Sequence, residues 1–406
     1  MRVSGNVAAL ALILGAILAS GCAARAARDD WAGVPGPEVL AKAQLQYYWR
    51  YRVPLDSGAT IQRIWRLDEN LYALTSGNRL ICLDAVVGTY KWGRQVAEAA
   101  QTVFAPSHAD SVMVPEAGGI AAIINPPDRA RMKAFNAVVI NTLSYALLLN
   151  RDTGEQVRRL PFDFAANTGC SADSTYLYAA STKGLFYAIR LADGLPHWTL
   201  STGDMISTRP KLFNRRLYVA SQDARFYAVN PEIERDRKLW TQETDAPLTA
   251  DFYVDARGCF VPSQDYRLYA YETAGGTDLW TFRTQGPLTQ GAQVGAKSVF
   301  QYSDNDKFYC IDIANGRERW TSPEARQVLA VVEPNVLALS ADGRLLVISE
   351  TLGKVEMSLP LTGLNLFARN AAKPMIFAAG RDGRFVCIRP AGAGALTAEM
   401  LKDEAK

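Results

Sequence analysis

Histidine, cysteine and acidic residues are the side chains of this chain that could act as nucleophiles, bases or metal ligands. The sequence has two histidines, His108 and His197, which lie 89 residues apart in no metal-spaced motif. A Ser-His-Asp triad or a hydrolytic metal site needs histidine beside a nucleophile or a second ligand, and neither pattern can be assembled here. We therefore expect no enzymatic activity, no cofactor and no metal, and we interpret His197 as a solvent-facing strand residue.

The acidic stretch SDNDKF, residues 303–308, has the composition of a calcium-binding loop. An EF-hand loop also needs a bidentate glutamate downstream, which is missing here, and similar polar turns recur elsewhere in the chain. We interpret the stretch as a hairpin turn, with a calcium site as the alternative.

Cys22 has a different chemistry, because it ends a secretory signal. Arg2 precedes an apolar run, residues 7–18, that is too short to span a bilayer, and a small-residue cleavage site follows. The ending LASGC resembles the bacterial lipobox, in which the cysteine is diacylated and becomes the first mature residue, although Ala19 stands where leucine is more usual. We predict a signal peptide over residues 1–22 and lipid attachment at Cys22; a soluble secreted protein is the alternative.

The residues after Cys22 indicate where the anchored protein lies. Ala23 stands where aspartate would be the common inner-membrane retention signal, which favours the cell envelope, with the protein on the outer membrane facing the periplasm. Residues 23–44 are small, polar and contain proline and glycine, so we predict a flexible tether. The 44 basic and 41 acidic residues are interspersed, with a net charge of +3, which argues against a nucleic-acid partner.

Tryptophans mark an internal repeat. Trp198, Trp240, Trp280 and Trp320 are spaced by 42, 40 and 40 residues, and Trp92 ends an earlier unit. In each unit two runs of β-branched and aromatic residues flank a polar turn, which is typical of a hairpin. A period near 40 with strand-like sequence is typical of a β-propeller.

The fixed positions within the repeat predict how its units pack. We expect each tryptophan to dock its unit onto a neighbour, and each glycine four residues before it to need a positive φ or a close backbone approach. Asp236 replaces this glycine in one unit. The predicted docking residues are Trp92, Trp198, Trp240, Trp280, Trp320, Gly88, Gly194, Gly276 and Gly316.

Three further units bring the total to eight. Two without tryptophan lie at residues 336–355 and 375–390, and a degenerate unit at 104–157 contains a loop inserted at 125–135. The last unit stops before its fourth strand, whereas YYWRYRVPL at residues 47–55 has the form of a fourth strand without a unit of its own. We therefore predict an all-β, eight-bladed β-propeller over residues 45–390, followed by a tail at 391–406. An N-terminal strand carrying Trp49 and Tyr51 pairs in the last blade and closes the ring.

The repeat resembles the PQQ-like repeat, whose signature is alanine, glycine six residues later and tryptophan four after that. Four units match it, with cysteine in place of alanine twice: Ala188-Gly194-Trp198, Ala270-Gly276-Trp280, Cys310-Gly316-Trp320 and Cys82-Gly88-Trp92. With the lipobox, the chain is similar to the BamB family of lipoproteins from the outer-membrane β-barrel assembly machinery. The resemblance implies envelope proteins, including that machinery, as partners.

The remaining cysteines are expected to be mostly structural. Cys82, Cys310 and Cys387 share one repeat position, where free cysteine behaves as a small hydrophobe. Cys170 and Cys259 are also expected to be free thiols, with a disulfide between them as the alternative. Quinoprotein dehydrogenases of this fold carry adjacent cysteines, which this sequence lacks.

The segments after the tryptophan strands, residues 203–210, 245–252 and 285–292, are expected to enter the ring near its axis. Their small polar side chains are candidates for the lining of a central channel, or else cap blade turns; they are Ser207, Thr208, Thr249, Thr289 and Gln290. The function we expect is a non-catalytic, lipid-anchored scaffold for protein–protein interaction at the cell envelope. The alternatives are a small-ligand binder or vestigial quinoprotein, and a polysaccharide-binding envelope protein.

Overall fold

The computed structural model describes residues 31–115, 132–233 and 235–402. It divides into a unit of Met1–Gly33 and a unit of Val34–Lys406, and the second holds all the strands. The predicted signal peptide, Cys22 and most of the predicted insertion at 125–135 lie outside the described residues. Within the described ranges, no helix has both the length and the apolar character needed to cross a membrane.

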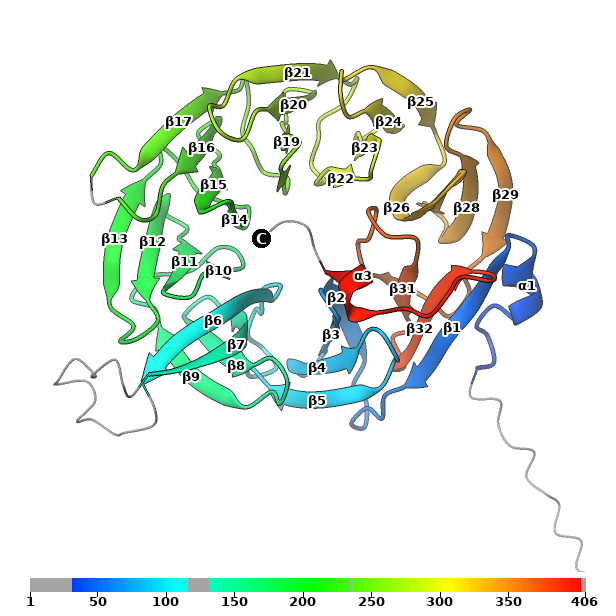
Figure 1. Ribbon diagram of the computed structural model, residues 1–406, viewed down its shortest axis with the longest axis horizontal. Helices are drawn as coiled ribbons and strands as arrows, with labels where there is room; N and C mark the ends of the chain where they lie inside the picture. Colours follow the sequence, from blue (N-terminus) through cyan, green and yellow to red (C-terminus); the bar gives the residue numbers. More distant parts are fainter. Residues whose placement is uncertain (1–30, 116–131, 234, 403–406) are drawn as a thin grey trace, which may run out of the picture. The chain divides into compact units, whose positions relative to one another are not determined.

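The second unit is a ring of eight four-stranded antiparallel sheets (Figure 1). In each sheet the strands run from an innermost strand near the axis to an outermost strand at the rim. Seven sheets consist of four consecutive strands, and the eighth combines the last three strands with the first. This arrangement confirms the predicted all-β, eight-bladed propeller.

The strand bounds follow the repeat. The first four consecutive blades contain β2 (Ile61–Leu67), β3 (Asn70–Thr75), β4 (Arg79–Asp84), β5 (Tyr90–Gln95); β6 (Ser107–Pro115), β7 (Met132–Asn141), β8 (Tyr145–Asn150), β9 (Gln156–Pro161); β10 (Ser171–Ala172), β11 (Tyr176–Ala180), β12 (Leu185–Arg190), β13 (Pro196–Ser201); β14 (Lys211–Phe213), β15 (Arg216–Ala220), β16 (Arg225–Val229) and β17 (Lys238–Glu243). The next three contain β18 (Tyr253–Asp255), β19 (Gly258–Pro262), β20 (Arg267–Tyr271), β21 (Asp278–Arg283); β22 (Gln293–Val294), β23 (Ser298–Tyr302), β24 (Phe308–Asp312), β25 (Glu318–Ser322); β26 (Ala325–Val332), β27 (Asn335–Ser340), β28 (Arg344–Ser349) and β29 (Val355–Pro360). The closing blade contains β30 (Leu366–Phe367), β31 (Ile376–Ala379), β32 (Arg384–Pro390) and β1 (Leu45–Arg52).

Burial along the strands explains their sequences. The middle strands are covered by neighbouring blades on both faces, so their residues are buried almost continuously, as in the last four residues of β15. The outermost strands face solvent on one side, and β21 buries only Trp280 among six residues. The core of the ring therefore lies between blades, in a series of separate apolar clusters.

The N-terminal strand closes the ring, as predicted. β1 pairs with β32 in antiparallel register from Leu45 opposite Pro390 to Arg52 opposite Arg384. Trp49 is buried in the cluster between the closing blade and the β2–β5 blade. Tyr51 lies opposite Phe385 in the same register.

The tryptophans connect each blade to the next. Trp280 lies on β21, and its indole N–H donates to the carbonyl of Ile313 in the following blade, at 2.9 Å. The same bond recurs from Trp49 to Ala85, Trp92 to Arg151, Trp198 to Pro231, Trp240 to Ala274 and Trp320 to Glu350. Each bond crosses from an outermost strand to the turn before the next blade's outermost strand.

The repeat glycines lie under these indoles. A Cβ atom added to Gly276 would lie 2.6 Å from Trp240 Cδ2 of the preceding blade, and one on Gly316 would lie 2.6 Å from Trp280 Cδ2. Both glycines have a positive φ. Gly194 faces Leu160 instead, because the β6–β9 blade has no tryptophan on its outermost strand. The glycine of the signature thus packs against the tryptophan of the neighbouring unit and not its own.

Both ends of the propeller are more ordered than the sequence indicates. Helix α1 (Pro37–Ala41) falls within the segment predicted as a tether, and Leu40 in it is fully buried. Helix α3 (Ala398–Leu401) falls within the predicted tail; its Leu401 is fully buried, and the carbonyl of Leu401 accepts a 2.6 Å hydrogen bond from Arg66. The first segment buries Leu40 and the second buries both Leu396 and Leu401, although the composition of each segment is mostly small and polar.

Candidate functional site

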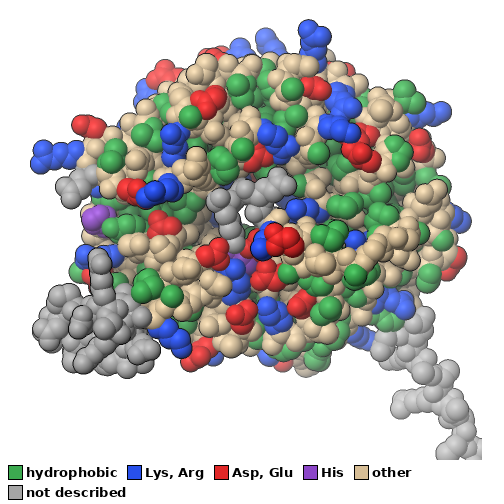
Figure 2. Space-filling view, viewed as in Figure 1, with side chains coloured by type: hydrophobic (Ala, Val, Ile, Leu, Met, Phe, Trp, Pro, Cys, Tyr) green, Lys and Arg blue, Asp and Glu red, His purple; other side chains and the backbone are tan. Residues whose placement is uncertain are grey.

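The ring encloses an axial cavity of about 980 Å³. Its described lining comes from the innermost strands, and from the residues beside them, of seven of the eight blades. Six basic and four acidic side chains line it, together with His108 and apolar residues such as Phe252. On the face shown in Figure 2, acidic and basic side chains are likewise interspersed over the ring.

The five residues predicted to line a channel are not among the residues that line this cavity. Thr208 is buried and donates to the carbonyl of Ala220, Thr249 accepts from Gln264, and Thr289 donates to Asp304. The hydroxyl of Ser207 is shielded from solvent, and Gln290 is exposed. The three threonines thus bond within the turns and connections at the ends of the blades.

The predicted segments do reach the axis, but with their last residues. Arg209 is the penultimate residue of the first segment, Asp251 and Phe252 end the second, and Ala292 ends the third; all four line the cavity. The residues that line the cavity lie on or beside the short innermost strands that follow these segments. Three-residue strands such as β14 are too short for a period-2 pattern to identify.

His108 belongs to a buried polar chain in the cavity wall. Its Nδ1 lies 2.9 Å from Asp68 Oδ2, and its Nε2 lies 2.9 Å from the hydroxyl of Tyr72. Tyr72 is fully buried, and burial raises its pKa well above the ordinary value, with Cys82 and other charges contributing less. These hydrogen bonds link β3 to β6 across the cavity wall. His197 is exposed and stacks on Tyr176 at 4.9 Å between ring centroids.

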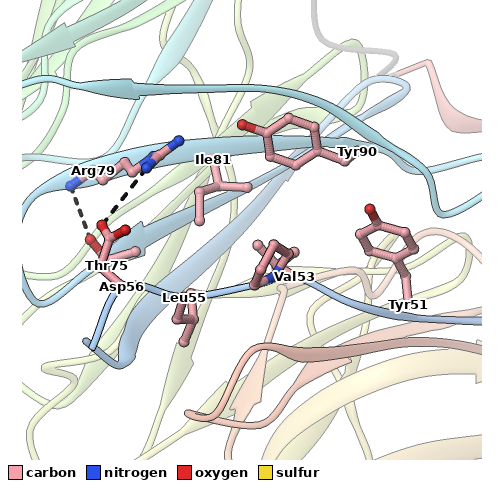
Figure 3. Close-up of a pocket in the computed structure, with 9 residues that line it drawn as sticks. Tyr51, Val53, Leu55, Asp56, Thr75, Arg79, Ile81 and Tyr90 are labelled. Carbon is pink, nitrogen blue, oxygen red and sulfur yellow. Dashed lines mark hydrogen bonds and ion pairs between the residues drawn. The ribbon is translucent and has the colours of Figure 1, made fainter. Parts of the chain in front are cut away.

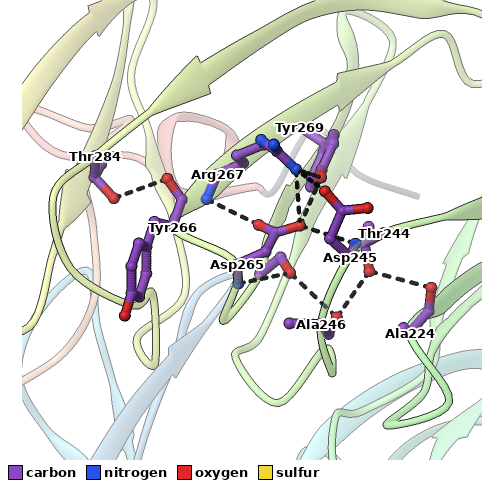
Figure 4. Close-up of polar contacts among 10 residues, drawn as sticks. Ala224, Thr244, Asp245, Ala246, Asp265, Tyr266, Arg267, Tyr269 and Thr284 are labelled. Atoms are coloured by element: carbon purple, nitrogen blue, oxygen red, sulfur yellow. Dashed lines mark hydrogen bonds and ion pairs between the residues drawn. The ribbon is translucent and has the colours of Figure 1, made fainter.

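A second polar cluster surrounds Asp265 (Figure 4) and recurs in the two neighbouring blades. The carboxylate of Asp265 accepts from the hydroxyl of Tyr269 at 2.6 Å and from the backbone N–H groups of Arg267 and Asp245. Asp223 and Asp306 occupy the equivalent positions, and each accepts from a tyrosine hydroxyl, of Tyr227 and Tyr309 respectively. The cluster holds the segment that connects two blades against a hairpin turn.

The stretch at residues 303–308 contains one of these turns, between β23 and β24. Asp306 Oδ2 accepts from Tyr309 at 2.5 Å and from the N–H of Gln285 at 3.2 Å, while Asp304 accepts from Thr289. The carboxylates are thus used in blade connection. Across the described ranges, no group of three histidine, cysteine or acidic residues is arranged to hold a metal ion.

The described cysteines are buried within the blades. Cys82, Cys170, Cys259, Cys310 and Cys387 are all buried and unpaired, so the alternative of a disulfide between Cys170 and Cys259 is not formed. Burial raises the pKa of Cys170 to about 12, with Arg209 lowering it by less, and burial likewise raises that of Cys387 to about 12. These thiols remain protonated at neutral pH and are poor nucleophiles.

A small groove of about 150 Å³ lies at the seam of the ring (Figure 3). The rings of Tyr51 and Tyr90 lie at one end of it, and Arg79 lies at the other, 3.7 Å from Asp56. Tyr51 therefore contributes both to the closing strand and to this groove. The groove is the place where the chain leaves the closing blade and enters the β2–β5 blade.

The repeat sequence matches a known protein family. The family model described as "Outer membrane protein assembly factor BamB" matches residues 144–257 and 264–399, more than half of the chain. This chain belongs to the BamB family. The match begins just before β8 of the β6–β9 blade, so the β2–β5 blade and the predicted insertion lie outside it.

Solved structures share the BamB-like propeller. The crystal structure of BamB from Moraxella catarrhalis has a TM-score of 0.62 at 13% identity, over 86% of this chain and 99% of that one. The computationally designed Ika8 protein has a TM-score of 0.59 at 12% identity, over 81% of this chain and 96% of that one. At such identities the likeness establishes the fold alone. No curated protein matches the chain.

Proposed function

We propose that this BamB-like propeller is a non-catalytic, lipid-anchored scaffold that binds other envelope proteins and takes part in the assembly of outer-membrane proteins. Its location is the outer membrane, on the periplasmic side, with attachment through Cys22. The observation that carries the proposal is the family match over most of the propeller. The lipobox ending at Cys22 supports the anchor.

The chemistry of the ring supports a binding role over catalysis. The groups with catalytic potential are engaged elsewhere: His108 between Asp68 and Tyr72, and the five described cysteines in blade interiors. Closure by β1 gives a ring whose blades all have neighbours on both sides. A rigid ring held at a membrane raises the local concentration of its partner without chemistry of its own.

The rim offers an apolar contact surface for such a partner. Leu239 and Leu279 occupy equivalent positions on the outermost strands of adjacent blades, and they are 40% and 46% exposed. The outermost strands also present an unpaired backbone edge, to which an extended segment can add. We place the partner's contact on β17 and β21.

Crosslinking in the native host, affinity purification and mass spectrometry test this role. Barrel-assembly proteins should be recovered with the wild-type chain, and the Leu239→Asp/Leu279→Asp variant should recover at least several-fold less of them. Leu352→Asp is the matched control, since Leu352 is 75% exposed on another blade. Recovery of the bait without any barrel-assembly protein would reject the assembly role.

The anchor has its own test. Labelled palmitate should be incorporated into the wild-type chain and not into Cys22→Ser, which should move from the membrane to the soluble fraction. Equal membrane recovery of both proteins would contradict lipid attachment at Cys22.

A further inference from the structure

The acidic side chains of the axial cavity mostly have local partners. Asp68 lies 2.9 Å from His108, and Asp110 forms an ion pair with Arg151. Asp173 accepts from the hydroxyl of Tyr178 at 2.6 Å and from two backbone N–H groups of the following turn. These carboxylates are therefore not available to neutralise the basic side chains across the cavity.

Asp251 is the carboxylate of the cavity that lies nearest to Lys211 and Arg369. Lys211 Nζ lies 3.2 Å from Asp251 Oδ1. Arg369 reaches the same place from the closing blade: a Cβ atom added to Gly291 would lie 3.1 Å from Arg369 Nη1 and 3.1 Å from Asp251 Cβ. One negative charge thus meets several positive charges that come from different blades.

Arg209 is held rigidly beside this group. Its Nη1 donates to the carbonyl of Pro106 at 2.8 Å and its Nη2 to that of Ala105, so it joins the β14 side of the cavity to the segment before β6. Burial lowers the pKa of Lys211, Asp251 opposes this, and Arg209 and Arg369 lower it further. The three cations therefore act on one another electrostatically around a single carboxylate.

Arg369 is the one of the three with free donors. Within the described ranges it makes no hydrogen bond or ion pair, and it is exposed at the cavity. A guanidinium presents five N–H donors in a fork that fits a carboxylate or a phosphate. Lys373, four residues further on, also lines the cavity and adds to the excess of positive charge.

We propose that Arg209, Lys211 and Arg369 form an anion-binding site in the axial cavity, and that its ligand is a small oxyanion with a charge near −2. Such a ligand matches the excess of two positive charges that Arg209, Lys211 and Arg369 have over Asp251. Phe252 and Leu212 provide apolar surface beside the charged groups, so the anion is the charged end of a small organic molecule or a free phosphate. The site lies at the axis and is separate from the rim surface on β17 and β21.

Isothermal titration of the full protein with inorganic phosphate and with succinate, at constant ionic strength set by chloride, tests the site. We expect saturable binding with one site per chain. Binding of phosphate alone would identify a phosphate group as the ligand chemistry, binding of succinate alone would identify carboxylates, and binding of both would show recognition by charge. Saturation by neither anion would overturn the proposal.

Arg369→Gln should weaken binding by about tenfold or more, because it removes a charge-assisted contact. The matched control is Arg283→Gln, which makes the same change of charge on the outermost strand β21. Circular dichroism and thermal unfolding without ligand verify the fold of both variants. Equal weakening by the two variants would show that binding follows net charge and not this site, and would overturn the assignment.

Discussion

At the scale of single residues, the contact between tryptophan and glycine holds the ring together. Trp240 lies on β17, its indole donates to Ala274, and its ring covers Gly276, which has a φ of +75°. The hydrogen bond sets the direction of the indole, and the missing Cβ lets the ring lie on the backbone. The glycine and the tryptophan of the repeat signature are thus explained by one contact between neighbouring blades.

Gly276→Ala should destabilise the protein more than Gly343→Ala. Both positions have a similar positive φ, which costs an L-residue about 1–2 kcal/mol. A Cβ atom at Gly343 meets nothing within 4 Å, whereas one at Gly276 must displace the Trp240 ring and adds about 1–3 kcal/mol. Urea denaturation measures the two free energies of unfolding. Equal losses would contradict the role assigned to the Trp240 contact.

At the scale of elements, β1 determines whether the ring is closed. It supplies the outermost strand of a blade whose other strands lie more than 300 residues later. It also supplies Trp49, whose indole donates to Ala85 of the β2–β5 blade at 3.0 Å. One strand therefore joins the two ends of the propeller by backbone pairing and by side-chain docking.

Trp49→Ala should lower the free energy of unfolding by about 3–5 kcal/mol, as expected for removal of a buried tryptophan. Hydrogen exchange should also become faster in β32, because the docked strand that covers it is weakened. Gln46→Ala is the control on the same strand; Gln46 is exposed, and its loss should change stability by about 0.5 kcal/mol or less. Unchanged exchange in β32 would mean that β1 stays paired without its tryptophan.

At the scale of the whole molecule, the buried thiols make stability depend on alkaline pH. Burial is the largest cause that raises the pKa of Cys82, Cys170, Cys310 and Cys387 from 9.0 to about 12 in the folded state. Between pH 9 and 12 the unfolded chain therefore loses these protons while the folded chain keeps them. Stability is unaffected by these groups below pH 9 and falls as the pH rises from 9 to 12.

Cys170→Ala should make this alkaline loss of stability less steep. Each thiol contributes up to about 1.4 kcal/mol per pH unit in the window, and the variant removes one of them. Denaturation midpoints at several pH values between 8 and 11 measure the slope for both proteins. Parallel curves would show that Cys170 ionises as easily in the folded state as in the unfolded chain.

The excess of positive charge in the axial cavity is also a property of the whole ring. Arg209 and Lys211 lie on one segment and Arg369 comes from the closing blade, far away in the chain, so their approach depends on closure of the ring. The overall net charge of +3 gives no sign of it. The proposed anion site therefore exists only in the assembled ring.

The sequence by itself determined the repeat, the number of blades and the closing strand. The spacing of Trp198, Trp240, Trp280 and Trp320 reports a unit that folds locally, since strand and turn preferences act over a few residues. The missing fourth strand of the last unit and the surplus strand at residues 47–55 could also be predicted from the sequence. Both are local patterns that need no knowledge of distant contacts.

Only the tertiary structure decided which residues meet across blades and at the axis. Gly276 packs against a tryptophan 36 residues earlier, and the cavity is lined by Arg209 and Asp251, not by Thr208 and Thr249. Leu40 and Leu401 likewise pack on the ring from segments of polar composition. Which side chain of a short strand faces the axis depends on the tilt and closure of all eight blades together, and no local pattern contains that information.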